Sequence, residues 1–308
     1  QNLDRALITL NTGFADVSIG RQAIAWGSAR ILNPTDIIAP FTFEELDTEE
    51  RIGVDAIRVQ IPVGVMGEFD TGYILGEDVE FGKSAFFLRS RLDAAETDIS
   101  ILLLGFRENL LTGLDIARAI GGAGLWFEGA YVFANAFDDD DTDPSSRSSD
   151  PSRTQDEASF ADNYLRTSIG LDYSFGEKTY GAIEYHFSQA GAKKPADYLA
   201  NLNGPAYTDG AVYLMGRHYL VPALTYQMTP LITFSGQALF NVSDASIFLS
   251  PQIEYNIAQD VYVSAGAFIG IGKRPEIVTG DDGAPTQRFR SEFGGYPNIY
   301  FSSFRIYF

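Results

Sequence analysis

Strict alternation of apolar and polar side chains over segments of about ten residues is the feature that most constrains this chain. From residue 247 to 257 the odd positions are apolar and the even positions are mostly polar, as Ile253 and Gln252 illustrate. The same period of two recurs over residues 165–175 and 179–187. Because side chains alternate faces along a β-strand, each segment presents one face suited to lipid and one suited to water. A strand of about 9–11 residues can also cross a bilayer.

Further segments with this pattern bring the expected number of strands to about fifteen. The connections between them alternate in length, so that short turns such as 176–178 fall between long connections such as 135–163. Short turns at one end and long loops at the other are the plan of outer-membrane barrels. The sequence therefore predicts an all-β fold: a transmembrane antiparallel β-barrel of about 14–16 strands in a single domain, residues 1–308, with short periplasmic turns and long extracellular loops. The expected strands are residues 3–10, 15–23, 53–61, 67–75, 84–92, 97–106, 109–119, 123–133, 165–175, 179–187, 215–227, 231–241, 247–257, 261–271 and 297–308.

The directions of the first and last strands add an expectation about closure. Residues 3–10 lead into a short turn and so run from outside to inside, and residues 297–308 run the same way. Two neighbours that run the same way cannot complete an antiparallel barrel, and bacterial single-chain barrels normally have an even strand count. We therefore expect either that the chain is incomplete or that its first strand lies upstream of Gln1.

The composition agrees with a barrel and excludes several other classes of protein. Aromatic residues make up 13% of the chain, yet its mean hydropathy is only −0.05. There is no cysteine and there are only 2 histidines, so no metal site or cofactor is expected. The chain has 41 acids and 22 bases, and the resulting net charge of −19 argues against nucleic acid as a partner. The expected partners are outer-membrane lipid and small hydrophilic solutes or ions.

Charged residues in the water-facing phase of the strands are the candidate pore lining. Inside a barrel they need water or an opposite charge. Two interpretations stay open: structural salt bridges in the lumen, or a constriction with arginines on one wall and carboxylates on the other, which would orient dipolar solutes and set ion preference. The candidates are Arg58, Arg89, Arg91, Arg166, Arg305, Glu128, Asp172, Glu184 and Glu254.

A motif near the N-terminus points to a family. It consists of Gly20-Arg21-Gln22, then Trp26-Gly27, then Asn33-Pro34-Thr35-Asp36. It resembles the Gly-Arg-Gln…Trp-Gly…Asn-Pro-Thr-Asp signature of a family of bacterial outer-membrane porin-like barrels, which are similar to the alginate-export porins. The resemblance implies a monomeric pore in a Gram-negative outer membrane.

The C-terminus carries a second resemblance. The last alternating strand ends on Phe308, and this ending resembles the sorting signal of bacterial outer-membrane barrels, with Ser303 in place of the usual glycine.

Arg21 conflicts with the alternation around it. It is in phase with Val17 and Ile19, which should face lipid, and a lipid-facing arginine near mid-membrane costs about 2–4 kcal/mol. Either the strand ends there, or a bulge at Gly20 turns Arg21 inward. We favour the bulge, with Trp26 as an interface anchor. The acidic residues between 44 and 50 could then fold back toward the lumen.

Three functions are compared. The first is a channel for passive diffusion of small hydrophilic solutes or ions, mildly cation-preferring because acidic loops such as 138–143 make its mouth negative. The second is a structural or scaffold barrel, plugged by its loops or bound to a protein partner. The third is an outer-membrane hydrolase that uses His186 or His218. Ser188 lies on the same face of its strand as His186, where the two side chains point alike, and no Gly-x-Ser-x-Gly elbow occurs. We therefore expect a channel and not an enzyme.

Overall fold

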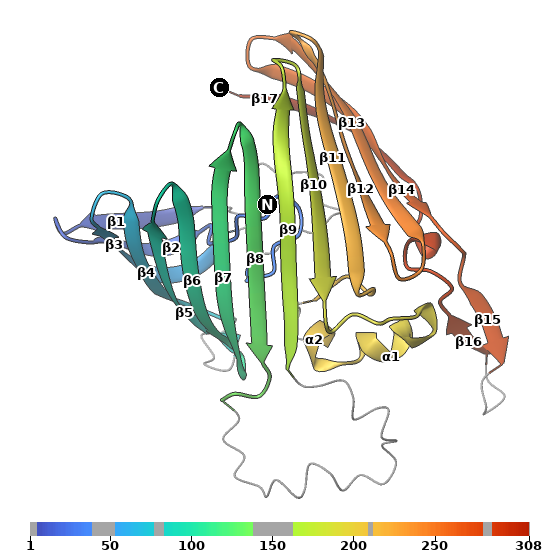
Figure 1. The fold of residues 1–308 in the computed structure, drawn as a ribbon, viewed down its shortest axis with the longest axis horizontal. Coiled ribbons are helices and arrows are strands. Elements are labelled where there is room, and N and C mark those ends of the chain that lie inside the picture. The colour runs from blue at the N-terminus through green and yellow to red at the C-terminus, as the bar shows by residue number, and fades with distance from the viewer. Residues whose placement is uncertain are drawn as a thin grey trace, which may run out of the picture.

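One curled antiparallel sheet makes up most of the molecule (Figure 1). The computed structural model describes residues 5–38, 53–76, 83–137, 163–208, 212–279 and 285–307. The sheet has 15 strands, and strands that follow each other in the chain are hydrogen-bonded neighbours. In order they are β1 (Ala6–Asn11), β2 (Asp16–Gln22), β3 (Val54–Val63), β4 (Gly67–Ile74), β5 (Ala85–Asp93), β6 (Thr97–Phe106), β7 (Asn109–Ile120), β8 (Ala123–Phe133), β9 (Tyr164–Phe175), β10 (Thr179–Ser188), β11 (His218–Thr229), β12 (Ile232–Asn241), β13 (Ser246–Ala258), β14 (Val261–Ile271) and β17 (Ile299–Ile306).

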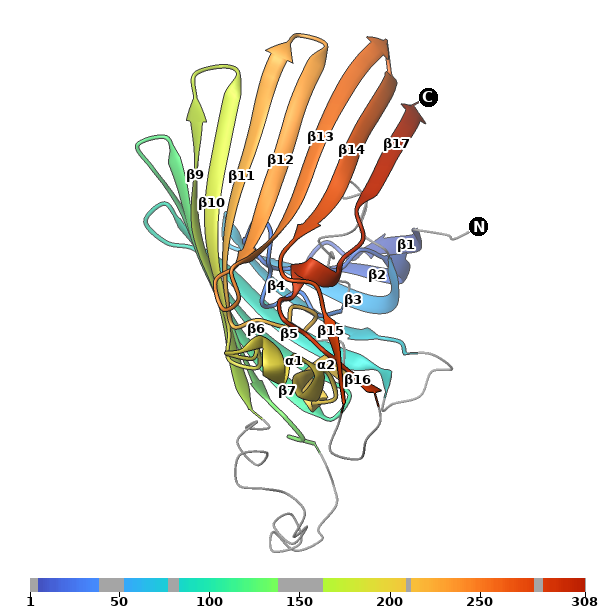
Figure 2. The same cartoon turned by 90° about the vertical axis from the view of Figure 1, so that its right-hand side faces the viewer.

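Two connections contain structure that the period-two pattern does not predict. The β10–β11 connection and the β14–β17 connection lie on the concave side of the sheet, apart from a hairpin that extends beyond it (Figure 2). In the described ranges, no helix is long and apolar enough to span a membrane. The additional elements are η5 (Pro195–Asp197), α1 (Tyr198–Leu202), α2 (Pro205–Thr208), the hairpin strands β15 (Glu276–Thr279) and β16 (Pro285–Arg288), and η6 (Phe293–Gly295).

The connections sort by length as expected, with two exceptions. At one end of the sheet every connection is tight, and the β7–β8 turn uses two consecutive glycines, Gly121 and Gly122, with φ of 57° and 85°. Glycine has no Cβ, so this left-handed backbone costs it little. The other end carries the five long connections, but also the short connections 107–108 and 242–245. We call these the short-turn end and the long-connection end.

The two faces of the strands are those that the alternation predicts. Tyr185, Ile253 and Tyr255 are 37%, 42% and 44% exposed on the convex face, whereas Glu184 on the concave face is fully buried. Phe304 is also exposed on the convex face. Most of the large exposed apolar side chains of the strands share this face, which gives the sheet an apolar exterior suited to lipid.

Strand β6 departs from alternation for a reason that the structure supplies. Its outward residues include Ile101 and Leu103, and its inward residues Leu102 and Leu104 are also apolar. The inward pair is buried in a cluster with Trp26 and Phe87, where the β2–β3 connection covers the wall. An inner face that meets protein instead of water does not have to be polar.

Two prolines inside strands interrupt the sheet only locally. Pro222 pairs with Ile183 of β10. On its other side, the β11–β12 ladder has no paired residues at Pro222 and continues beyond it in the same register. Pro251 pairs with Gly236 of β12, and the β13–β14 ladder pauses in the same way. Because proline lacks only its own N–H, each one disturbs one of the two ladders of its strand.

The expected bulge at Gly20 is wrong. The ladders from β2 to β1 and to β3 both run through Gly20 without a register shift, so Arg21 stays on the convex face. There it forms an ion pair with its cross-strand neighbour Asp55, with Nη2 3.3 Å from Oδ2. Strand β2 ends one residue later at Gln22. The other expectation for Arg21, that its strand ends nearby, is the one that agrees with the structure.

The edges of the sheet are β1 and β17. Each strand is antiparallel to its neighbours, so the first and the fifteenth strands run in the same direction. Direct antiparallel pairing between these edges is therefore impossible, and antiparallel closure requires an odd number of strands between them.

We predict that the two faces of β13 respond differently to a charge. Ile253→Arg places a guanidinium on the apolar convex face and should lower the free energy of unfolding in lipid vesicles by about 2–4 kcal/mol. Gln252→Arg, its neighbour on the concave face, should lower it by much less. Urea unfolding of both variants in vesicles measures the difference, and equal losses would contradict the assignment of faces.

Candidate functional site

Residues 23–38, which we call the inner segment, lie against the concave face of β7 to β10. Glu128 of β8 and Glu184 of β10 are fully buried beneath it. One oxygen of Glu128 accepts hydrogen bonds from the backbone N–H and the hydroxyl of Thr35, at 2.8 and 2.7 Å. The other accepts from the backbone N–H of Ala29 at 3.0 Å and from the amide of Asn33 at 3.3 Å. This carboxylate therefore binds both arms of the inner segment.

Glu184 binds the middle of the same segment. It accepts the backbone N–H groups of Arg30, Ile31 and Leu32 at 2.9, 3.3 and 2.8 Å. The indole N–H of Trp126 donates to it at 3.1 Å. Consecutive N–H groups that converge on one anion form the kind of concavity that proteins use to bind anions. Here the anion belongs to the wall and the concavity belongs to the inner segment.

The motif residues build this segment. Asp36 accepts from the backbone N–H of Trp26 at 2.8 Å, which closes the segment into a loop. Asn33 donates to the carbonyl of Ala29 at 2.8 Å. A Cβ on Gly27 would overlap the carboxylate of Glu128, so only glycine allows that approach. At the start of the motif, the side-chain amide of Gln22 donates to backbone carbonyls, among them that of Ala56 at 3.2 Å. Within this chain, the motif residues therefore make the contacts that fold the inner segment and hold it against the sheet.

Trp26 is not an interface anchor. It is only 5% exposed, and its ring centroid lies 4.8 Å from that of Phe87 on the concave face of β5. Apolar wall residues such as Leu111 and Val132 complete this cluster. The expectation failed because the motif turns into the sheet at its long-connection end instead of continuing along the membrane surface.

A second buried network fixes the other two inward connections. Glu292 accepts hydrogen bonds from the hydroxyl of Tyr219 at 2.5 Å, the amide of Asn241 at 2.6 Å and the backbone N–H of Met215 at 2.8 Å. Asp244 accepts the backbone N–H of Glu292 at 2.6 Å. It also accepts the hydroxyl of Tyr198, from α1, at 2.8 Å. Burial raises the pKa of Glu292 to about 7.

Charged residues nearer the short-turn end lie on the same concave face. Arg58 holds Asp70 through two hydrogen bonds, of 2.8 and 2.7 Å. Arg89 stands opposite Asp70 in the β4–β5 register, and its Nε donates to the hydroxyl of Ser100 at 2.7 Å. Arg91 stands opposite Glu68. Arg89 and Arg91 lie closer to the short-turn end than Phe87, where the inner segment contacts β5. Along β5 the inward side chains become more exposed toward that end, from buried Phe87 to exposed Arg91.

The remaining candidates lie on strands β9 and β13 and on β17. Arg305 forms an ion pair with Glu254 across β14. Arg166 is buried on the inner face of β9. Asp172 of the same strand accepts from Tyr180 at 2.9 Å. Thus Glu128 and Glu184 hold a segment in place, Arg58 and Arg305 are paired, and a conducting path along any of the nine residues stays a prediction.

Two residues that make contacts at the inner segment escaped the sequence analysis. Arg30 extends from the inner segment into the lumen, where its Nε is 3.1 Å from Asp172 and its guanidinium lies 5.4 Å from the ring centroid of Trp126. Asp115 of β7 accepts the backbone N–H of Ser28 at 2.9 Å. The signal for Arg30 was its position between Trp26 and Asn33 of the motif. Asp115 has the same inward phase as the other wall acids.

The histidines do not form a reactive site with Ser188. His186 instead has its Nδ1 2.8 Å from the hydroxyl of Ser168, and both side chains are buried. Ser168 donates its proton to the carbonyl of Leu32 at 2.5 Å. The pair therefore ties the inner segment to the wall. His218 accepts or donates a 2.7 Å hydrogen bond with Tyr185 on the convex face.

Several expectations fall outside the described residues. These are the inward return of the acids between 44 and 50, the acidic loop 138–143, and the end of the last strand at Phe308.

Comparisons with solved structures show the fold. Nearly the whole of this chain is similar to each of three proteins of Pseudomonas aeruginosa. It matches OccK11 (OpdR) with a TM-score of 0.55 and 6% identity, covering 98% of this chain and 80% of that one. It matches OccD3 (OpdP) with a TM-score of 0.53 and 9% identity, covering 99% of this chain and 78% of that one. It matches OccK5 (OpdH) with a TM-score of 0.52 and 8% identity, covering 98% of this chain and 81% of that one.

These similarities show that the chain has the fold of outer-membrane β-barrel porins. No protein-family model matches the sequence. No curated protein matches it either.

We predict that Glu184 keeps the inner segment docked. Glu184→Ala leaves the N–H groups of Arg30 and Leu32 without their acceptor, and should destabilise docking by about 3 kcal/mol. Hydrogen exchange of the peptide spanning residues 27–36 should accelerate, while exchange of the strands stays slow. Glu254→Ala is the matched control, because that carboxylate pairs with Arg305 and touches no part of the segment. Equal acceleration in both variants would refute the role.

We predict that the Glu292 network weakens at high pH. A carboxyl whose pKa is raised to about 7 binds its proton more tightly in the folded protein, so the network is most stable below the ordinary pKa of 4.5. Stability is lost as pH rises through about 7. The amide of Met215 should therefore be better protected from hydrogen exchange at pH 6 than at pH 8, after correction for intrinsic rates. Glu292→Gln should remove this difference, and an unchanged difference would assign it to another group.

Proposed function

We propose that this protein is a porin-like channel of a Gram-negative outer membrane, through which small hydrophilic solutes or ions diffuse passively. One observation carries the proposal: the sheet has an apolar convex face, while its concave face carries partly exposed charged residues such as Arg89 and Arg91. Such a wall separates lipid from water. The similarity to outer-membrane porins supports this assignment through the fold. The long connections would then be extracellular and the short turns periplasmic.

The inner segment gives the proposed channel a narrow zone. It occupies the concave face at the long-connection half, and Arg30 reaches from it beside Asp172. Arg58, Arg89 and Arg91 lie nearer the short-turn ends of their strands, beyond the positions that the segment contacts. A solute would pass between a guanidinium-bearing wall and carboxylates, an arrangement that orients dipolar molecules. This supports the constriction interpretation, in which Arg30 would be part of the constriction.

A plugged scaffold barrel is the second candidate, and a specific observation favours it. The inner segment and the β10–β11 connection fill one apolar cluster, and the β14–β17 connection completes another with Phe248 and Phe268. Inward connections packed this well could close the lumen. Single-channel recording in planar bilayers separates the two: a stable open-state current supports the channel, and its absence supports the scaffold. The Ser168–His186 pair gives no support to a hydrolase, because it is buried beneath Leu32.

We predict a mild cation preference at low salt. The net charge of −19 is concentrated in acidic loops such as 138–143, which would make the mouth negative and raise the local cation concentration. The preference should fade toward none at about 1 M salt, where the Debye length is about 3 Å. The reversal potential under a salt gradient measures it.

Paired variants identify the source of this preference. Neutralising Asp138 to Asp141 should reduce the preference, whereas the double change R89Q and R91Q should increase it. An anion preference of the unmodified protein at low salt would contradict the prediction. It would show that the arginines dominate, in which case anionic solutes such as carboxylates or acidic sugars would be the better substrates.

A further inference from the structure

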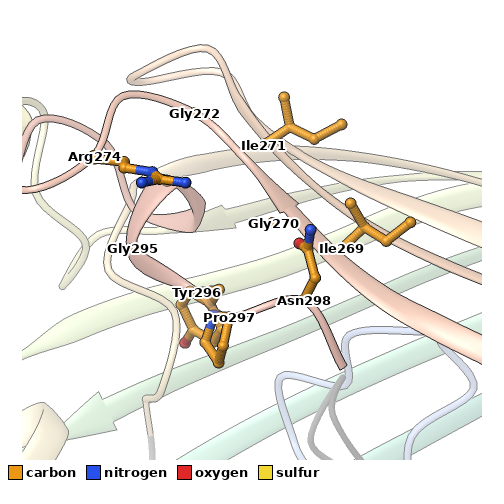
Figure 3. Close-up of a pocket in the computed structure, with 10 residues that line it drawn as sticks. Ile269, Gly270, Ile271, Gly272, Arg274, Gly295, Tyr296, Pro297 and Asn298 are labelled. Carbon is orange, nitrogen blue, oxygen red and sulfur yellow. The ribbon is translucent and has the colours of Figure 1, made fainter. Parts of the chain in front are cut away.

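The wall has a notch at the long-connection end of β14, where β14 extends beyond its neighbour β17. The β14–β17 ladder ends at the pair Phe268 and Ile299, so Ile269 and Ile271 lie beyond it. There the chain after η6 diverges from β14 and a cavity of about 620 Å³ opens between them (Figure 3). Four glycines form much of its lining, which leaves bare backbone at the surface of the cavity.

The cavity combines a cation with apolar side chains. Ile269 and Ile271 have the outward phase of β14, and Ile271 is 47% exposed. Arg274 lies on one side of the cavity and Asn298 on the opposite side (Figure 3). Tyr300, just beyond on β17, is 74% exposed on the convex face. The cavity therefore opens at the border of the apolar exterior, at the long-connection end.

The charge of Arg274 is available for a ligand. Within the part of the chain that the structure describes, it has no ion-pair partner. The nearby Glu276 is approached instead by Arg288 and Arg290, at 4.0 and 3.8 Å. In a chain of net charge −19, an arginine that faces such a cavity favours an anionic ligand. Arginine is the side chain best suited to bind phosphate through paired hydrogen bonds.

We propose that this notch binds the phosphorylated headgroup of a glycolipid in the outer leaflet. Arg274 binds the phosphate, the amide of Asn298 donates to a headgroup oxygen, and an acyl chain runs along Ile269 and Ile271. A lipid fits better than a free solute because Ile269 and Ile271, which line the cavity, have the outward phase of β14. The inference rests on the proposed outer-membrane location, since that location places phosphorylated glycolipid beside the cavity.

The test measures binding by the full chain, refolded in detergent without lipid, using native mass spectrometry. The probes are a diphosphoryl glycolipid of the lipid A type and its dephosphorylated form. The unmodified protein should bind the diphosphoryl form about tenfold more tightly, as expected for one charge-assisted contact worth about 1.4 kcal/mol. R274Q should abolish that difference. R288Q is the matched control, because Arg288 stands beside Glu276 outside the cavity, and it should keep the difference.

Other outcomes overturn the proposal. Equal binding of both glycolipids by the unmodified protein, or a difference that survives in R274Q, would refute it. Displacement of the glycolipid by millimolar inorganic phosphate would show a site for free phosphate instead of a lipid. Single-channel recordings on the same preparations separate this inference from the proposed function. A protein that conducts without discriminating between the glycolipids loses only the lipid site, and one that discriminates without conducting loses only the channel.

Discussion

The hydrogen bonds from the inner segment to Glu128 and Glu184 are the interaction on which the rest of the interior depends. A carboxylate buried inside a protein is costly unless donors satisfy its oxygens. Here each carboxylate has four donors, and seven of these eight come from residues 29–35. Each side satisfies the other, because the segment needs acceptors for its N–H groups and the buried carboxylates of the wall need donors. Docking therefore solves both problems at once.

This docking divides the concave face into two regions. Where the segment covers the wall, inward side chains such as Leu104 and Phe87 are apolar and pack as in a soluble core. Where it leaves the wall open, the inward side chains are Arg89, Gln252 and similar polar groups. In the proposed channel, the same strands would therefore meet lipid outside, protein at one end and an aqueous path at the other. The constriction of the proposed channel lies where these regions meet, near Arg30 and Asp172.

The fold followed from the sequence because period-two alternation is a local property. Every expected strand is present, and Tyr185 and Tyr255 lie on the face assigned to them. The exceptions were local too: Leu102 broke the pattern only because a distant segment covers it. The candidate site was predicted as a set of inward phases, but not as a set of contacts. Glu128 and Arg58 have the same phase, yet one binds backbone N–H groups and the other binds Asp70.

The sequence by itself determined the strands, their faces, their antiparallel order and the acidic charge, since these depend on spacing and composition. Tertiary structure alone decided where the connections go. The motif from Gly20 to Asp36 was visible in the sequence, but its residues specify a loop whose partners lie about ninety to one hundred and fifty residues away. No local period encodes that distance. Whether Trp26 meets lipid or Phe87, and whether Arg21 turns inward or pairs with Asp55, was therefore settled only when the sheet curled around the inner segment.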